Sequence, residues 1–174
     1  MSHKRLFFGL DATDQAPALC QLQQRVALDA KPVVAENLHL TLIFLGQVAD
    51  DRLDALCQLG QAVAQCHGPM VITLDKLGCF HLAQVAWIGP TQPPATLLAL
   101  EQALRSGVTR LAFPLEARPY RPHVSLFRKA RELPPHDAPP ITLQAHALHL
   151  YESCSTPEEV RYIKLASWPL TTDN

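Results

Sequence analysis

The first hydrophobic positions of the chain predict a strand followed by a helix. Residues 5–10 open on an arginine and are otherwise apolar or glycine, which is typical of a buried strand. After a polar pair that can cap a helix (residues 13–14), the apolar residues Leu19, Leu22 and Val26 recur at helical spacing. The chain therefore begins with one β-α step.

A second strand and helix follow in the same order. Residues 37–45 are rich in apolar and β-branched side chains and end at Gly46, which predicts a largely buried strand. Apolar positions between residues 53 and 64 then follow helical spacing, and Gly68-Pro69 ends this second helix.

The middle of the chain predicts two more strands and a third helix. Residues 70–74 and 85–88 have strand character and are joined through residues 78–80, so we expect an antiparallel hairpin. Residues 95–106 carry a helical apolar stripe, and Gly107 is suited to cap the end of that helix.

Strands resume in the last third of the sequence. Residues 123–127, 141–151 and 160–165 are β-like, and the proline-rich residues 133–140 form a loop between them. This order of elements predicts the α+β class with mainly antiparallel sheet. A length of 174 residues is enough for one core, so we expect a single domain over residues 1–174.

Charge and hydropathy limit the function classes. Fifteen Lys and Arg against sixteen Asp and Glu give a net charge of -1, so a broad basic surface for duplex nucleic acid is not expected. The apolar run at residues 6–10 stops at Asp11, too early for a signal peptide, and no later run is long enough to span a bilayer. We expect a cytoplasmic monomer with no membrane contact and no obligate protein partner.

The cysteines give no sign of a metal or disulfide framework. They are odd in number and scattered, without a C-x-x-C pair, at Cys20, Cys57, Cys66, Cys79 and Cys154. We expect reduced, mostly buried thiols, no metal site and no cofactor.

Two tetrads of the same form carry the candidate chemistry. His39-Leu40-Thr41-Leu42 and His123-Val124-Ser125-Leu126 both have the order histidine, apolar, hydroxyl, apolar, and both lie in predicted strands. Because side chains alternate along a strand, the histidine and the hydroxyl of each tetrad share one face. With eight histidines in the chain, chance would give about 0.2 such tetrads. Either tetrad alone would more simply be a core strand, but the pair favours a site.

Two imidazoles with two hydroxyls fit phosphoester chemistry without a metal. A neutral imidazole can take a proton from water while a protonated one gives a proton to the leaving oxygen, each step contributing roughly 10²–10⁴-fold. The hydroxyls of Thr41 and Ser125 can bind the phosphate oxygens, and a nearby cation can neutralise their charge.

Several segments resemble the two-histidine phosphoesterases, in particular the bacterial RNA 2′,3′-cyclic phosphodiesterases that are also known as 2′-5′ RNA ligases. The similar segments are residues 5–8, 37–46, 85–89 and 118–128. The resemblance implies two pseudo-symmetric lobes of antiparallel sheet with flanking helices and a central cleft. It also implies that His39 is the general acid, His123 the general base, and that Thr41 and Ser125 bind phosphate.

The resemblance further implies that Arg128, five positions after the second histidine, is the phosphate cation. Strict strand alternation instead puts Arg128 on the face opposite His123 and keeps Arg121 in phase with it. Either a bulge redirects Arg128, or Arg121 takes its place.

Three functions remain open at this point. The first is hydrolysis of an RNA terminal 2′,3′-cyclic phosphate, or of a cyclic nucleotide, to a 2′-phosphate. The second is ATP-independent 2′-5′ ligation, which is the same displacement in reverse. The third is a non-catalytic module that binds RNA ends. No G-x-x-x-x-G-K loop is present, which disfavours an ATP-driven enzyme. Phe80, on the predicted turn, is left out of the site because packing explains it more simply than base stacking.

Overall fold

The structure is a computed structural model that describes residues 2–172. Its strands are β1 (His3–Asp11), β2 (Lys31–Pro32), β3 (His39–Ala49), β4 (Met70–Leu74), β5 (Lys76–Phe80), β6 (Val85–Gly89), β7 (Val124–Arg128), β8 (Ile141–Ala145), β9 (Ala147–Ser155) and β10 (Val160–Pro169). Its α-helices are α1 (Ala16–Val26), α2 (Leu53–Ala64) and α3 (Ala95–Arg110). Short 3-10 helices are η1 (Thr13–Gln15), η2 (Ala35–Asn37) and η3 (Asp50–Arg52).

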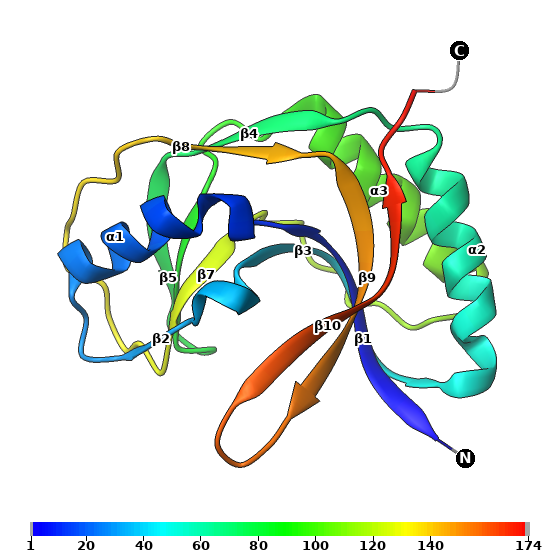
Figure 1. Cartoon of the computed structure of the whole chain (residues 1–174), viewed down its shortest axis with the longest axis horizontal. Coiled ribbons are helices and arrows are strands. Elements are labelled where there is room, and N and C mark those ends of the chain that lie inside the picture. Colours follow the sequence, from blue (N-terminus) through cyan, green and yellow to red (C-terminus); the bar gives the residue numbers. More distant parts are fainter. Residues whose placement is uncertain (1, 173–174) are drawn as a thin grey trace.

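The strands form one large antiparallel sheet and one small one. The large sheet has the order β10-β9-β1-β3-β7-β6-β5, with β2 added to β7, and the small sheet pairs β4 with β8. The predicted α+β class with antiparallel sheets is confirmed. The lobe with β10, β9, β1 and β3 meets the lobe with β7, β6 and β5 at the contact between β3 and β7 (Figure 1).

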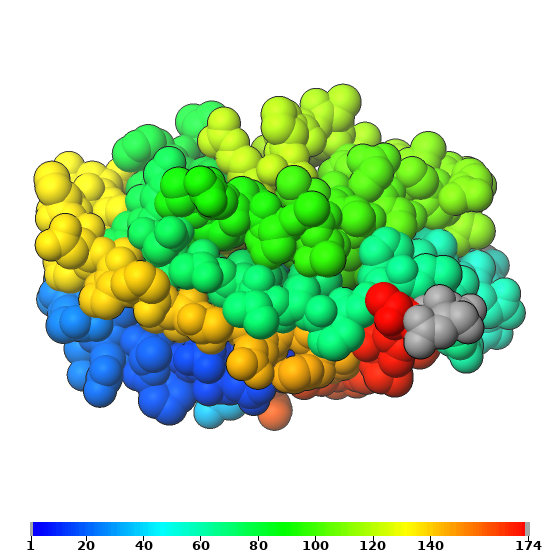
Figure 2. All heavy atoms as spheres, turned by 90° about the horizontal axis from the view of Figure 1, so that it is seen from above, coloured from blue at the N-terminus to red at the C-terminus, as the bar shows by residue number. Residues whose placement is uncertain are grey.

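The helices flank the two lobes on different sides. α2 packs on α3 and against β9 and β10, whereas α1 contacts β7 of the other lobe (Figure 1). In the space-filling view, a gold band containing β8 runs between the blue N-terminal segment and the green segments that contain β4 and α3 (Figure 2). The core is continuous from Phe8 of β1 through Leu56 of α2 to Leu126 of β7.

The predicted hairpin of residues 70–74 with 85–88 is wrong. β4 pairs with β8, and the hairpin partner of β6 is β5, a segment that the sequence pattern assigned to the connection. β5 gives a weak signal because its residues are only half-buried or exposed and one of them is Gly78. A Cβ at Gly78 would lie 2.2 Å from the ring of Trp87, so the glycine is needed for that ring to cross the strand.

Two further boundaries differ from the sequence prediction. The strand over residues 141–151 is two strands, which separate at His146 and join different sheets. The third helix continues to Arg110, and Gly107 lies inside it. Gly107 is not a cap but a close contact, because a Cβ there would lie 2.3 Å from a methyl carbon of Leu59 on α2.

The free thiols are less buried than the sequence suggests. All five cysteines are free, but the expectation that most are buried is wrong: Cys66 is exposed and the other four are partly exposed.

No helix within residues 2–172 has the length and apolarity needed to cross a membrane.

Gly89 lets the end of β6 approach the residue before His123. A Cβ at Gly89 would lie 2.6 Å from the backbone oxygen of Pro122, so we expect Gly89→Ala to cost about 1–3 kcal/mol of unfolding free energy. The matched control is Gly68→Ala, whose Cβ would meet only a methyl carbon of Thr172 at 3.1 Å. Urea unfolding measures both, and equal stabilities would contradict a tight contact at Gly89.

Candidate active site

The two tetrads lie side by side at the junction of the lobes. β3 and β7 pair antiparallel through Leu40 and Val124, both fully buried, so the side chains one residue to either side point to the opposite face. Antiparallel direction then sets His39 on the side of Ser125, and Thr41 on the side of His123. The structure thus brings the two predicted histidines and both hydroxyls to one face of the sheet.

Each tetrad has a β-bulge at its last residue, and the bulge in β7 determines the direction of Arg128. In the pairing of β6 with β7, Ala86 faces Phe127 and Trp87 faces Ser125, so Leu126 is an extra residue. Leu126 and Phe127 are consequently both buried, and Arg128 returns to the face of Ser125. Leu42 is the equivalent extra residue in β3, where Ile43 is the second buried neighbour.

The alternative cation, Arg121, contributes its backbone. Its side chain is exposed, and its carbonyl oxygen lies 2.7 Å from Nδ1 of His123. Because a carbonyl only accepts, Nδ1 of His123 carries the proton, and Nε2 of the neutral ring is left as the basic nitrogen.

His39 is held in the same way. Its Nδ1 donates to the backbone oxygen of Asn37 at 2.8 Å, and its Nε2 accepts from the hydroxyl of Thr41 at 2.8 Å. The backbone oxygen of Thr41 in turn accepts from the hydroxyl of Tyr120 at 2.8 Å. The first histidine therefore has a fixed tautomer and ring orientation.

Aromatic rings pack against both histidines in a matching arrangement. Tyr162 lies edge-on to His39 with ring centroids 4.8 Å apart, and Phe80 lies edge-on to His123 at 4.9 Å. Phe7 and Trp87 take the second positions, at 4.8 Å from His39 and 6.0 Å from His123. Phe80, which the sequence analysis left out, is thus a packing residue directly beside the second histidine.

Burial by these rings keeps the histidines neutral. It lowers the pKa of His39 to about 4, and the charge of Arg128, with that of His123 when it is protonated, acts in the same direction, against the hydrogen bond to Asn37. Burial also lowers the pKa of His123, opposed by its hydrogen bond to Arg121. Both rings are therefore uncharged near pH 7 in the free protein.

The strand β10 adds residues that sequence reasoning missed. The hydroxyl of Tyr162 accepts a hydrogen bond from the guanidinium of Arg128, which joins the two lobes across the site. Lys164 forms an ion pair with Asp11 at 2.5 Å, and Asp11 is the cross-strand neighbour of His39. Tyr162 and Lys164 are two residues apart on an edge strand, but this spacing in the sequence does not indicate that the strand lies beside His39.

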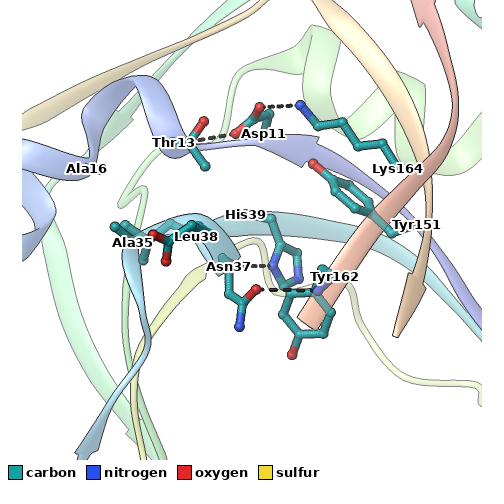
Figure 3. A pocket seen from close by; sticks show the side chains of 11 residues that line it. Asp11, Thr13, Ala16, Ala35, Asn37, Leu38, His39, Tyr151, Tyr162 and Lys164 are labelled. Carbon is teal, nitrogen blue, oxygen red and sulfur yellow. Dashed lines mark hydrogen bonds and ion pairs between the residues drawn. The ribbon is translucent and has the colours of Figure 1, made fainter. Parts of the chain in front are cut away.

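A hollow of about 500 Å³ adjoins His39, as Figure 3 shows. Asp11, Lys164, Tyr151 and Tyr162 are among its lining residues, and the Asp11–Lys164 pair stands at its upper edge in the view. His39 lines it, whereas Thr41 and the second tetrad do not, so the hollow borders the site on the side of the first histidine. In the described part of the chain, no three His, Cys, Asp or Glu side chains gather as a metal-binding group.

Comparison with known proteins agrees with this geometry. The sequence model of the 2′-5′ RNA ligase superfamily matches residues 11–160. The chain belongs to the 2′-5′ RNA ligase superfamily. It is 36% identical over 147 residues to the RNA 2′,3′-cyclic phosphodiesterase of Escherichia coli K12, covering 81% of this chain and 80% of that protein.

Solved structures of this superfamily share the fold over nearly the full length. E. coli LigT complexed with 3′-AMP has a TM-score of 0.87 at 32% identity, covering 98% of this chain and 99% of that one. TT0787 of Thermus thermophilus has a TM-score of 0.82 at 27% identity, covering 98% of this chain and 100% of that one. The two-lobed fold expected from the sequence is confirmed by these similarities.

A third buried histidine, outside the tetrads, predicts acid sensitivity. His149 is 8% exposed, its Nδ1 lies 2.7 Å from the hydroxyl of Ser167, and burial lowers its pKa to about 4. As the pH falls below 6.5, the unfolded chain binds a proton at this residue and the folded chain does not, so stability is lost toward acid. We expect His149→Gln to remove up to about 1.4 kcal/mol per pH unit of that loss.

Urea unfolding at about pH 7 and about pH 5 measures the effect. The matched control is His136→Gln, which removes an exposed histidine. The same acid slope in His149→Gln and in the unchanged protein would contradict the effect of burial.

Proposed function

We propose that this protein hydrolyses RNA terminal 2′,3′-cyclic phosphates to 2′-phosphates with His39 as general acid and His123 as general base. The observation that carries the proposal is the pair of tetrads on one face, each histidine fixed through Nδ1 to a backbone oxygen so that Nε2 is the nitrogen that can exchange a proton; in His39 it accepts from the hydroxyl of Thr41. The named activity of the E. coli relative supports the same reaction class.

The reaction needs one proton removed and one delivered. His123 takes a proton from water through Nε2 while the water oxygen attacks phosphorus. The bond from phosphorus to the ribose 3′-oxygen breaks, and His39 gives its proton to that oxygen. The phosphate remains on the 2′-oxygen, and each histidine ends in the protonation state that the other reaction direction requires.

Substrate binding favours uptake of a proton from solvent by His39. In the free protein, burial keeps the pKa of His39 near 4, and the charge of Arg128 acts in the same direction. A cyclic phosphate carries one negative charge, and an anion beside His39 favours the protonated ring. The acid is thereby charged mainly when substrate occupies the site.

The hydroxyls of Thr41 and Ser125 and the guanidinium of Arg128 bind the phosphate. Thr41 and Ser125 share the face of the histidines, and Arg128 returns to that face after the bulge at Leu126. Charge developing on the non-bridging oxygens is then met by the hydroxyl of Ser125, by that of Thr41 once protonated His39 no longer accepts from it, and by one cation.

The proposal also covers the substrate, the cellular location and the oligomeric state of the protein. We assign the substrate to an RNA 3′ end or a cyclic nucleotide, and the protein to the cytoplasm as a monomer without a membrane or protein partner. The E. coli relative is named for RNA, and LigT was solved with 3′-AMP, which has the size of one terminal nucleotide.

The direct test uses an oligoribonucleotide that ends in a 2′,3′-cyclic phosphate and protein treated with EDTA. We expect a 2′-phosphate product, with kcat lowered roughly 10²–10⁴-fold by His39→Ala or His123→Ala. The exposed His146, changed to Ala, is the matched control and should retain activity.

The outcomes separate the competing functions. Turnover retained by the double variant of His39 and His123 would contradict the mechanism. Binding of the RNA without product would favour a module that binds RNA ends. Joining of a second RNA with a free 5′-hydroxyl, faster than hydrolysis, would favour ligation.

A second test decides between the two arginines. A charge-assisted hydrogen bond contributes about 1.5–3 kcal/mol, so Arg128→Gln should lower kcat/KM roughly 10- to 100-fold. Arg121→Gln should change kcat/KM by less than about 3-fold, because the backbone oxygen that holds His123 remains. The reverse order of effects would assign the phosphate contact to Arg121.

A further inference from the structure

Asn37 contacts the active site with two different groups. Its backbone oxygen accepts from Nδ1 of His39 at 2.8 Å. Its side-chain amide turns toward β10, and its hydrogen bond with Tyr162 is drawn in Figure 3. One residue, at the end of η2, therefore joins the general acid to a strand far away in the sequence.

The side-chain amide replaces a missing strand neighbour. β10 is the edge of the large sheet, so its outward backbone groups lack a partner strand. Nδ2 of Asn37 donates to the backbone oxygen of Val160 at 2.6 Å, and Oδ1 accepts from the backbone nitrogen of Tyr162 at 3.3 Å. One amide thus binds the donor and the acceptor that a neighbouring strand would have bound.

The held segment of β10 carries Tyr162, whose ring packs on His39. Tyr162 lies edge-on to His39, with an angle of 77° between the ring planes, and it also packs edge-on to Phe7. Its hydroxyl accepts from Arg128 of the other lobe. Any shift of β10 at this point moves both the cover of His39 and the support of Arg128.

We infer that Asn37 is a positioning residue whose side-chain amide holds β10 so that Tyr162 covers His39 and orients Arg128. The inference rests on the proposed function for its kinetic consequence. Its structural consequence, the fixed environment of the His39 ring, can be measured without substrate.

The charged and titratable groups around His39 determine how that environment responds. Asp11 of β1 faces the ring and is paired with Lys164 of β10, Arg128 contributes positive charge from β7, and His123 beside β7 does so only when it is protonated. The rings of Tyr151 of β9 and Tyr162 of β10 also face the His39 ring. Asn37 itself carries no charge, so Asn37→Ala changes burial without changing the local charge.

The experiment combines an NMR titration of the His39 ring with steady-state kinetics on the cyclic-phosphate RNA. For Asn37→Ala we expect the pKa of His39 to rise by at least about one unit, because water gains access to the ring, and kcat/KM to fall by about 10-fold or more. For Tyr162→Phe we expect a similar fall in kcat/KM through a higher KM, with the pKa of His39 unchanged, because only the hydroxyl for Arg128 is lost.

The matched control is Thr156→Ala. Its hydroxyl accepts from the backbone nitrogen of Glu159 at 3.0 Å at the tip of the same hairpin, away from Asn37. This variant should leave both readouts at their starting values. If Thr156→Ala matches Asn37→Ala, general loosening of the hairpin explains the effect and the inference is wrong.

The remaining outcomes are also decisive. An unchanged His39 pKa and unchanged kinetics in Asn37→Ala would overturn the inference. A raised pKa in that variant, with no hydrolysis by the unchanged protein, would overturn the proposed function and leave the positioning role intact. If Asn37→Ala does not fold, an unchanged KM in Tyr162→Phe still contradicts the link to Arg128.

Discussion

The site depends on one antiparallel contact, between Leu40 of β3 and Val124 of β7. Both side chains are fully buried, which fixes the register, since a shift of one residue would expose them and bury the histidines. From this contact, the alternation of side chains sends His39 and Thr41, with His123 and Ser125, to the opposite face. The contact between the lobes lies within the candidate site, so the packing of the core also holds the site residues in place.

Burial acts on both histidines in the same direction. Aromatic rings remove water from His39 and His123, which lowers their pKa values and keeps both rings uncharged in the free protein. The charge of Arg128 adds to this effect at His39. Under the proposed mechanism, the acid must carry an extra proton, and a bound phosphate anion favours that protonated form.

The two lobes are equivalent around the tetrads but differ at the fifth position after each histidine. A bulge in each strand turns that position to the site face, where the first lobe has Phe44 and the second has Arg128. Phe44 is 49% exposed, and the guanidinium of Arg5 lies 4.7 Å from its ring centroid. At equivalent backbone positions, the first lobe thus has an aromatic side chain and the second lobe has a cationic one.

The sequence by itself determined most of the strands, the helices and the two tetrads, because alternation and helical spacing are local properties. It determined the α+β class, but it mispaired β4, since partner choice depends on contacts between distant residues. Only the tertiary structure decided that a bulge at Leu126 redirects Arg128, because a bulge is defined by the partner strand. For the same reason, only the folded chain brings Tyr162 into contact with His39 and with Asn37, from which it is 125 residues away in the sequence.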